Sequence, residues 1–129
     1  MHVPVGHIHE MEVVVDDPMS PPFLPIPVLS TPGLVLLIEE TCRLGVEPFL
    51  SQGRATVGTH IDVSHARAVR LGETLRIKSV LVAVDGRRLV FETEAHCARG
   101  QVSAGRHERS IIRLETLGLL LASPAGDAS

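Results

Sequence analysis

A single long apolar segment, PGLVLLIEETCRLGV, is followed by four segments in which apolar and polar residues alternate. The apolar segment opens with Thr31-Pro32, and a hydroxyl residue before a proline is a typical helix start. Apolar residues recur along it with the helical period, and Pro48 marks its end. One buried helix and several later strands predict an α+β layer fold.

The strands are predicted by a change of period after the helix. Five segments have the composition or alternation of strands: 7–15, 55–64, 73–84, 87–98 and 101–114. Asp85-Gly86 is the signal of a tight hairpin, and Gly72 and Gly100 mark two further turns. Long antiparallel strands of this kind predict a curved sheet wrapped around the helix.

A proline-rich loop separates the first strand from the helix. The stretch DDPMSPPFLPIPVLS contains five prolines, each of which fixes φ and removes a backbone donor. Long loops in compact domains are often binding loops, and this one leads directly to Thr31.

Length and composition predict one domain over residues 1–129, with flexible ends at 1–6 and about 120–129. Hydrophobic residues make up 44% of the chain, but aromatics make up only 2%, with no Trp or Tyr. The core is therefore expected to consist of Val, Leu, Ile and Ala.

Charge and hydropathy argue against nucleic-acid and membrane partners. The net charge is −3, and no basic stripe carries interleaved aromatics. No apolar run reaches the roughly 18 residues of a membrane span, and the N-terminus lacks the order of a signal peptide. Cys42 and Cys97 have no metal-ligand spacing, and reduced thiols in a cytoplasmic protein are the simplest interpretation.

A hydroxyl, a carboxylate and an imidazole are the parts of an acyl-transfer site, and Thr31, Glu39 and His65 supply them. Glu39 lies at the edge of the apolar stripe, either as a general base or as a helix residue paired with Arg43. Thr31 either reacts or donates at the helix N-terminus, or only caps it. His65 ends the segment THIDVSH, either as an acid, base or oxyanion donor or as a surface imidazole.

Other polar and small residues allow weaker interpretations. Gly58 marks a bulge or a close backbone approach, and Arg109 is costly in a strand unless it is paired. Cys42 reads as a small core residue. Two pairs that share a strand face, His60 with Asp62 and His7 with His9, lack a third ligand nearby. No metal site is therefore predicted.

The order of these motifs resembles the hot dog-fold thioesterases, and among them the bacterial fluoroacetyl-CoA thioesterases. The resemblance covers about residues 25–115 and runs through TPG, VGTHIDVSHARAVRLGETL and GRHERSIIRLE. Thr31, Glu39 and His65 match the catalytic threonine, glutamate and histidine of the family. Gly58 matches a glycine that approaches the substrate carbonyl, and Arg109 an arginine near the site.

The resemblance implies a hot dog fold and hydrolysis of a small acyl-CoA or related pantetheine thioester. It also implies a homodimer or higher oligomer with the site near the dimer interface, and no cofactor beyond the coenzyme A of the substrate. Two positions differ from the family. SPPFLPIPV has prolines in place of gating phenylalanines, so Phe23 is the aromatic residue expected at the substrate, and Glu40 replaces a tryptophan.

Two alternatives share the fold. One is a non-catalytic module that binds acyl thioesters or small ligands. The other is a hot dog-fold enoyl-CoA hydratase, but no Asp and His five residues apart follow the helix as in those enzymes.

Overall fold

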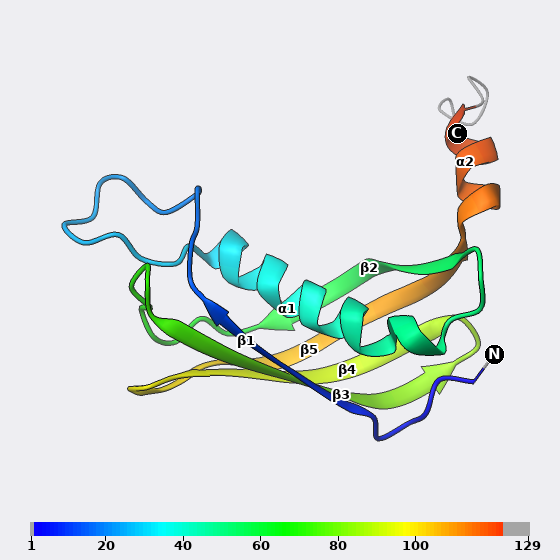
Figure 1. The fold of residues 1–129 in the computed structure, drawn as a ribbon, viewed down its shortest axis with the longest axis horizontal. Helices are drawn as coiled ribbons and strands as arrows, with labels where there is room; N and C mark the ends of the chain where they lie inside the picture. Colours follow the sequence, from blue (N-terminus) through cyan, green and yellow to red (C-terminus); the bar gives the residue numbers. More distant parts are fainter. Residues whose placement is uncertain (1, 123–129) are drawn as a thin grey trace.

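The computed structural model describes residues 2–122, which form one antiparallel sheet with a helix across one face (Figure 1). The strand order is β1-β3-β4-β5-β2. The elements are β1 (Ile8–Val14), α1 (Thr31–Val46), a 3-10 turn (Glu47–Phe49), β2 (Arg54–Val63), β3 (Thr74–Asp85), β4 (Arg88–Cys97), β5 (Gly100–Arg113) and α2 (Leu114–Ala122). The α+β class and all five strands are confirmed, and each strand end lies within one residue of its predicted position.

The predicted turns hold the strands together. Gly72, Gly86 and Gly100 all have positive φ, which residues with a side chain rarely adopt. Gly86 closes the β3–β4 hairpin with a φ of 59°. The Asp-Gly signal was therefore correct.

Helix α1 begins where the sequence predicts, with Ser30 as its N-cap. The Ser30 hydroxyl accepts a hydrogen bond from the Gly33 backbone at 3.0 Å, which leaves the Thr31 side chain free for another partner. Leu34, Ile38, Cys42 and Val46 form the buried stripe. The prediction of a helix wrapped by the sheet is not met on the outer face of α1: Leu36 is 54% exposed, because α1 lies on the sheet rather than inside it.

The core has two apolar clusters on the helix side of the sheet. One lies near the start of α1, around Leu34, Ile38 and Ile77. The other lies near its end, around Val46, Leu81 and Phe91. Aliphatic residues fill most of both clusters, as the composition predicts. The buried His107 was not expected in this core.

Residues 114–122 were not predicted to be a helix. The sequence predicts a last strand that ends at 114 and a flexible end from about 120, whereas α2 runs over Leu114–Ala122. Helix α2 projects from the sheet next to the start of β2 (Figure 1). The final residues of the predicted flexible tail, 123–129, lie outside the described part of the chain.

The proline-rich loop is fastened to α1 by a carboxylate that the sequence did not single out. Asp17 is 5% exposed and accepts hydrogen bonds from the backbone amides of Ser30 (2.7 Å) and Met19 (3.0 Å). Burial alone would raise the pKa of Asp17, but the hydrogen bonds from Ser30 and Met19 outweigh it and lower that pKa. Asp17 therefore fixes the loop end that leads into Thr31.

We expect Asp17→Asn to lower the free energy of unfolding at pH 7 by about 1–3 kcal/mol, because charge-assisted bonds to two amides are weakened. The lowered pKa means that this stabilisation is present above the unfolded-state value of about 3.9 and is lost below it. Urea unfolding at several pH values should therefore show the difference shrinking in acid. Asp16→Asn, at an exposed neighbour, is the control. An equal loss in the free energy of unfolding in Asp16→Asn would contradict this role of Asp17.

Candidate active site

The first part of the candidate site is the pair formed by Thr31 and His65. Thr31 Oγ1 lies 2.9 Å from His65 Nδ1, within hydrogen-bond distance. Thr31 is the first residue of α1, and His65 lies just after β2, so the sheet edge and the helix start meet here. The structure thus brings together two of the three predicted catalytic residues.

A hollow of about 250 Å³ lies beside this pair. Its lining comes from the end of the proline-rich loop and the segment after β2: Val28, Leu29, His65, Ala66, Arg67 and Ala68. The hollow is small, and its lining combines four aliphatic or small side chains with the His65 imidazole and the Arg67 guanidinium. This is the form of a site for a small apolar group held beside a hydrogen-bonding pair.

The second part of the site surrounds Gly58 in the edge strand β2. A Cβ on Gly58 would lie 3.0 Å from Glu39 Oε1 and 3.5 Å from the nearest Arg109 nitrogen. The β2–β5 register shifts between Gly58 and His60, so Gly58 begins a bulge. Both predictions for Gly58, a bulge and a close approach, are confirmed, and the approaching group is the Glu39 carboxylate.

Arg109 is buried and is held by three acceptors. It donates to Thr56 Oγ1 and to the Thr56 carbonyl, both at 2.8 Å, and its third nitrogen lies 3.1 Å from His107 Nε2. Burial lowers the pKa of Arg109, and the negative charge of Glu39 opposes this effect. The arginine predicted to need a partner therefore has Glu39 as its nearby counter-charge.

His107 belongs to this group, although it is not among the predicted site residues. Its Nδ1 lies 2.7 Å from the His60 carbonyl, which can only accept, so Nδ1 carries a proton. Its Nε2 faces Arg109, which can only donate, so Nε2 has none. His107 is therefore held as one neutral tautomer. The signal in the sequence was its spacing of two from Arg109, which puts both on one strand face.

The two parts of the site are separated along α1. Thr31 and Glu39 are eight positions apart, which is about 12 Å along a helix axis. In the described part of the chain, no hydrogen bond joins Glu39 to Thr31 or His65. The alternative pairing of Glu39 with Arg43 is wrong, because Arg43 pairs with Glu40 and Glu47.

Phe23 is not brought to either part. It lies in the proline-rich loop and is 84% exposed. Its predicted contact with substrate remains a prediction.

Gly58→Ala tests how closely Glu39 must approach the backbone. We expect the rate of a reaction that uses Glu39 to fall by about 10- to 100-fold, because the added methyl group displaces the Glu39 carboxylate by a few tenths of an ångström. Steady-state kinetics and circular dichroism separate this effect from unfolding. Gly53→Ala is unsuitable as a control because of its positive φ, whereas Gly118→Ala meets nothing within 4 Å. Similar losses in both variants would contradict this account.

The environment of His107 predicts a pH dependence of stability. Burial is the main cause that lowers its pKa, Arg109 adds to it, and the His60 carbonyl, Glu39 and Glu108 oppose it. The contribution of the neutral His107 ring to the free energy of unfolding is therefore complete above the unfolded-state pKa of about 6.5. It is lost as the pH falls below that value. We expect urea unfolding to show a steeper loss of stability from neutral to acid pH in the parent than in His107→Asn. Equal slopes would contradict this.

The Cys42 thiol does not contribute a reactive group. Cys42 and Cys97 are both free and buried. Burial raises the pKa of the Cys42 thiol to about 12, so it stays protonated at neutral pH. The interpretation of Cys42 as a core residue therefore agrees with its surroundings.

Within residues 2–122, no three His, Cys, Asp or Glu side chains gather closely enough to hold a metal ion. No helix in that range has the length and apolar character needed to cross a membrane.

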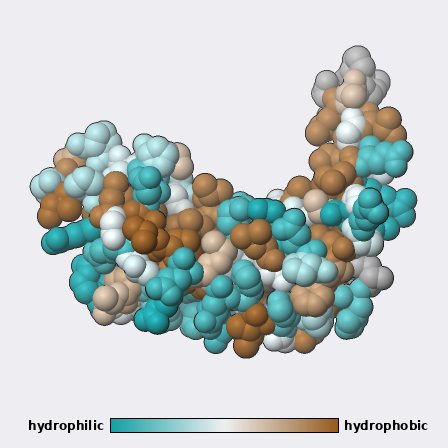
Figure 2. Space-filling model, in the orientation of Figure 1, coloured by the Kyte–Doolittle hydropathy of each residue, from teal (hydrophilic) through white to brown (hydrophobic). Residues whose placement is uncertain are grey.

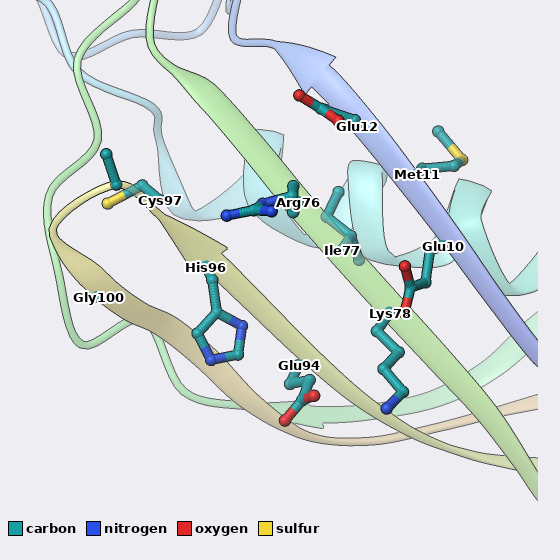
Figure 3. A pocket seen from close by; sticks show the side chains of 11 residues that line it. Glu10, Met11, Glu12, Arg76, Ile77, Lys78, Glu94, His96, Cys97 and Gly100 are labelled. Carbon is teal, nitrogen blue, oxygen red and sulfur yellow. The ribbon is translucent and has the colours of Figure 1, made fainter.

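A groove of about 610 Å³ lies on the sheet face opposite α1 (Figure 3). Charged side chains of neighbouring strands face one another there, with Glu12 opposite Arg76 and Glu10 opposite Lys78. Since Ile77 between them packs into the core, Arg76 and Lys78 point away from α1. The groove contains none of the predicted site residues, and its charges of both signs favour no one ligand.

Known proteins match this chain over the stretch that contains both parts of the candidate site. A family model for fluoroacetyl-CoA-specific thioesterase matches residues 11–115. The fluoroacetyl-CoA thioesterase of Streptantibioticus cattleyicolor is 36% identical over 112 residues, which are 84% of this chain and 81% of that protein.

Solved structures agree with the fold. A structure of the fluoroacetyl-CoA thioesterase superimposes with a TM-score of 0.86 at 29% identity, and covers 96% of this chain and 100% of that one. A hot-dog-like protein from Thermanaerovibrio acidaminovorans has a TM-score of 0.84 at 21% identity, with 92% and 90% of the two chains covered. The predicted hot dog fold is confirmed.

Proposed function

Because this chain belongs to the fluoroacetyl-CoA-specific thioesterase family, we propose that it hydrolyses small acyl-CoA thioesters to a carboxylic acid and free coenzyme A. The observation that carries the proposal is the placement of the Glu39 carboxylate against the Gly58 backbone, with the Thr31–His65 pair at the start of the same helix and just after the same edge strand. No cofactor takes part, and coenzyme A enters as part of the substrate.

The proposed reaction uses Glu39 at the thioester carbonyl. Glu39 either attacks this carbon or takes a proton from the attacking water, while charge develops on the carbonyl oxygen. The Gly58 amide is proposed to stabilise that charge. In either route the carbon–sulfur bond breaks, a carbon–oxygen bond replaces it, and the leaving thiolate takes up a proton. When water attacks directly, the acid is formed in this step; when Glu39 attacks, a water then hydrolyses the acyl–Glu39 anhydride, which releases the acid and restores the carboxylate.

Thr31 and His65 are proposed to act on the leaving thiolate or on the attacking group. Their hydrogen bond orients the imidazole, and Thr31 lies in the first turn of α1, where the helix dipole favours negative charge. The hollow beside His65 is the proposed place of a small acyl or pantetheine segment, and Arg67 on its rim offers a cation to a phosphate. Phe23 and the proline-rich loop are proposed to contact the substrate.

A homodimer is part of the proposal. β2 is an edge strand, and four successive residues in it, Val57–His60, are exposed although the strand lies beside the site. Pairing of two β2 edges would cover the unpaired backbone groups and place both copies of Gly58 at the interface.

Helix α2 gives a second reason to expect an assembly. Its apolar side chains stand clear of the sheet (Figure 2), and Leu119, Leu120 and Leu121 are each more than half exposed. Contiguous apolar surface of this kind usually marks a contact with another chain. Sedimentation analysis should give twice the mass of the chain.

We place the enzyme in the cytoplasm, where both buried thiols stay reduced.

The Thr31 hydroxyl provides the test of this site. Thiol release from acetyl-CoA should fall by about 10²-fold or more in Thr31→Val and His65→Ala, and the double variant should lose little more than either. Thr31→Ser, which keeps the hydroxyl, should retain most activity. Losses that simply multiply in the double variant would show that the two residues act independently and would contradict the pairing.

A further inference from the structure

We infer that His107 is a positioning residue for the reaction: together with Arg109 it braces the β2 bulge and so fixes the Gly58 backbone toward the substrate carbonyl. This inference deepens the proposed function and rests on the role given there to Gly58.

The brace holds β2 on both sides of Gly58. On one side, Arg109 binds both the hydroxyl and the carbonyl of Thr56, two positions before Gly58. On the other side, His107 donates to the carbonyl of His60, two positions after it. A hydrogen bond from an Arg109 guanidinium nitrogen to His107 Nε2, 3.1 Å long, joins these two anchors to each other. The bulge is thus tied at both ends to two alternate positions of β5, which share a strand face.

The bulge needs such support because of its position. It lies in an edge strand, where within one chain only β5 pairs with it, and the register shift removes a regular ladder contact there. Glycine also has more backbone freedom than other residues. Without the two anchors, the direction of the Gly58 amide would not be fixed, although about 0.5 Å of precision is needed at a catalytic donor.

The brace also sets the distance between Gly58 and Glu39. His107 Cε1 lies 3.3 Å from the place of a Cβ on Gly58, on the same side as Glu39 Oε1. His107 is fully buried against Phe91, with ring centroids 6.3 Å apart, so its ring has little freedom to move. The position of the His107 ring therefore limits where the Glu39 carboxylate can lie beside Gly58.

Three substitutions separate the two bonds of the imidazole. His107→Phe removes both bonds, and we expect kcat to fall by about 10- to 100-fold with little change in KM. In His107→Asn the amide nitrogen takes the place of Nδ1 and can still donate to His60, so kcat should recover in large part. His107→Gln, which keeps only an acceptor for Arg109, should resemble His107→Phe. His96→Phe, on the opposite sheet face, is the matched control and should keep the parent kcat.

Folding is monitored by circular dichroism and urea unfolding, and kcat is corrected for the folded fraction. A folded His107→Phe with the kcat of the parent would overturn the inference. So would an equal loss in His107→Asn and His107→Phe, because a merely structural role would not depend on the retained donor.

A second measurement does not depend on activity. The amide resonance and hydrogen exchange of Gly58 should change in His107→Phe and stay close to the parent in His107→Asn. If the parent released no thiol but the Gly58 amide changed as expected, the proposed function would fail while the brace would stand. An unchanged amide in His107→Phe would overturn the brace, whatever the activity of the parent.

Discussion

Glu39→Gln should lower thioester hydrolysis by about 10²- to 10⁴-fold and leave the fold intact. The amide has the shape of the carboxylate, so it fits beside Gly58, where Glu39 Oε1 lies 3.0 Å from the place of a Cβ. It can neither take a proton from water nor attack a carbonyl. Either proposed route therefore stops, and steady-state thiol release from acetyl-CoA measures the loss.

Glu40→Gln is the matched control for this substitution. Glu40 is the next residue on α1, and its carboxylate pairs with Arg43 at 2.8 Å on a partly exposed surface. Such pairs contribute about 0–1 kcal/mol, so activity should remain and stability should change little. Equal activity in Glu39→Gln and the parent would remove Glu39 from the mechanism.

Arg109→Met should be the most destabilising of the substitutions considered, by about 2–4 kcal/mol. The methionine removes the donors to Thr56 Oγ1, to the Thr56 carbonyl and to His107 Nε2, and leaves these buried acceptors unpaired. It also leaves Glu39 without its nearby cation. Urea unfolding at pH 7 gives the loss of stability.

Arg106→Met is the control on the same strand, at an exposed position. We expect its effect to stay within about 0.5 kcal/mol. A folded Arg109→Met with the stability of the parent would show that the buried arginine is not needed to satisfy these acceptors.

Local signals account for the parts of the fold that the sequence predicts. Thr31-Pro32 defines the start of α1, and Asp85-Gly86 defines a hairpin, because caps and tight turns depend on neighbouring residues. Helix α2 is not predicted by such local signals. Its sequence, LETLGLLLA, is a short apolar run whose period does not distinguish helix from strand, and it directly continues β5.

The site depends on contacts between residues distant in sequence. Thr31 and His65 are 34 positions apart, and Ser30 and Asp17 are 13 apart. Residue types alone left Thr31, Glu39 and His65 with ordinary alternatives, and the family resemblance favoured their roles. It covered the stretch that contains His107 but assigned that residue no role, because a histidine within an alternating strand gives no sign of which groups its ring will meet.

Thiol release from a panel of acetyl-, fluoroacetyl-, isobutyryl- and benzoyl-CoA tests the central claim most directly. The account predicts saturable hydrolysis of at least one small acyl-CoA by the parent, and its near-complete loss in Glu39→Gln measured under the same conditions. Absence of thiol release from every member of the panel, with a folded protein, would contradict it.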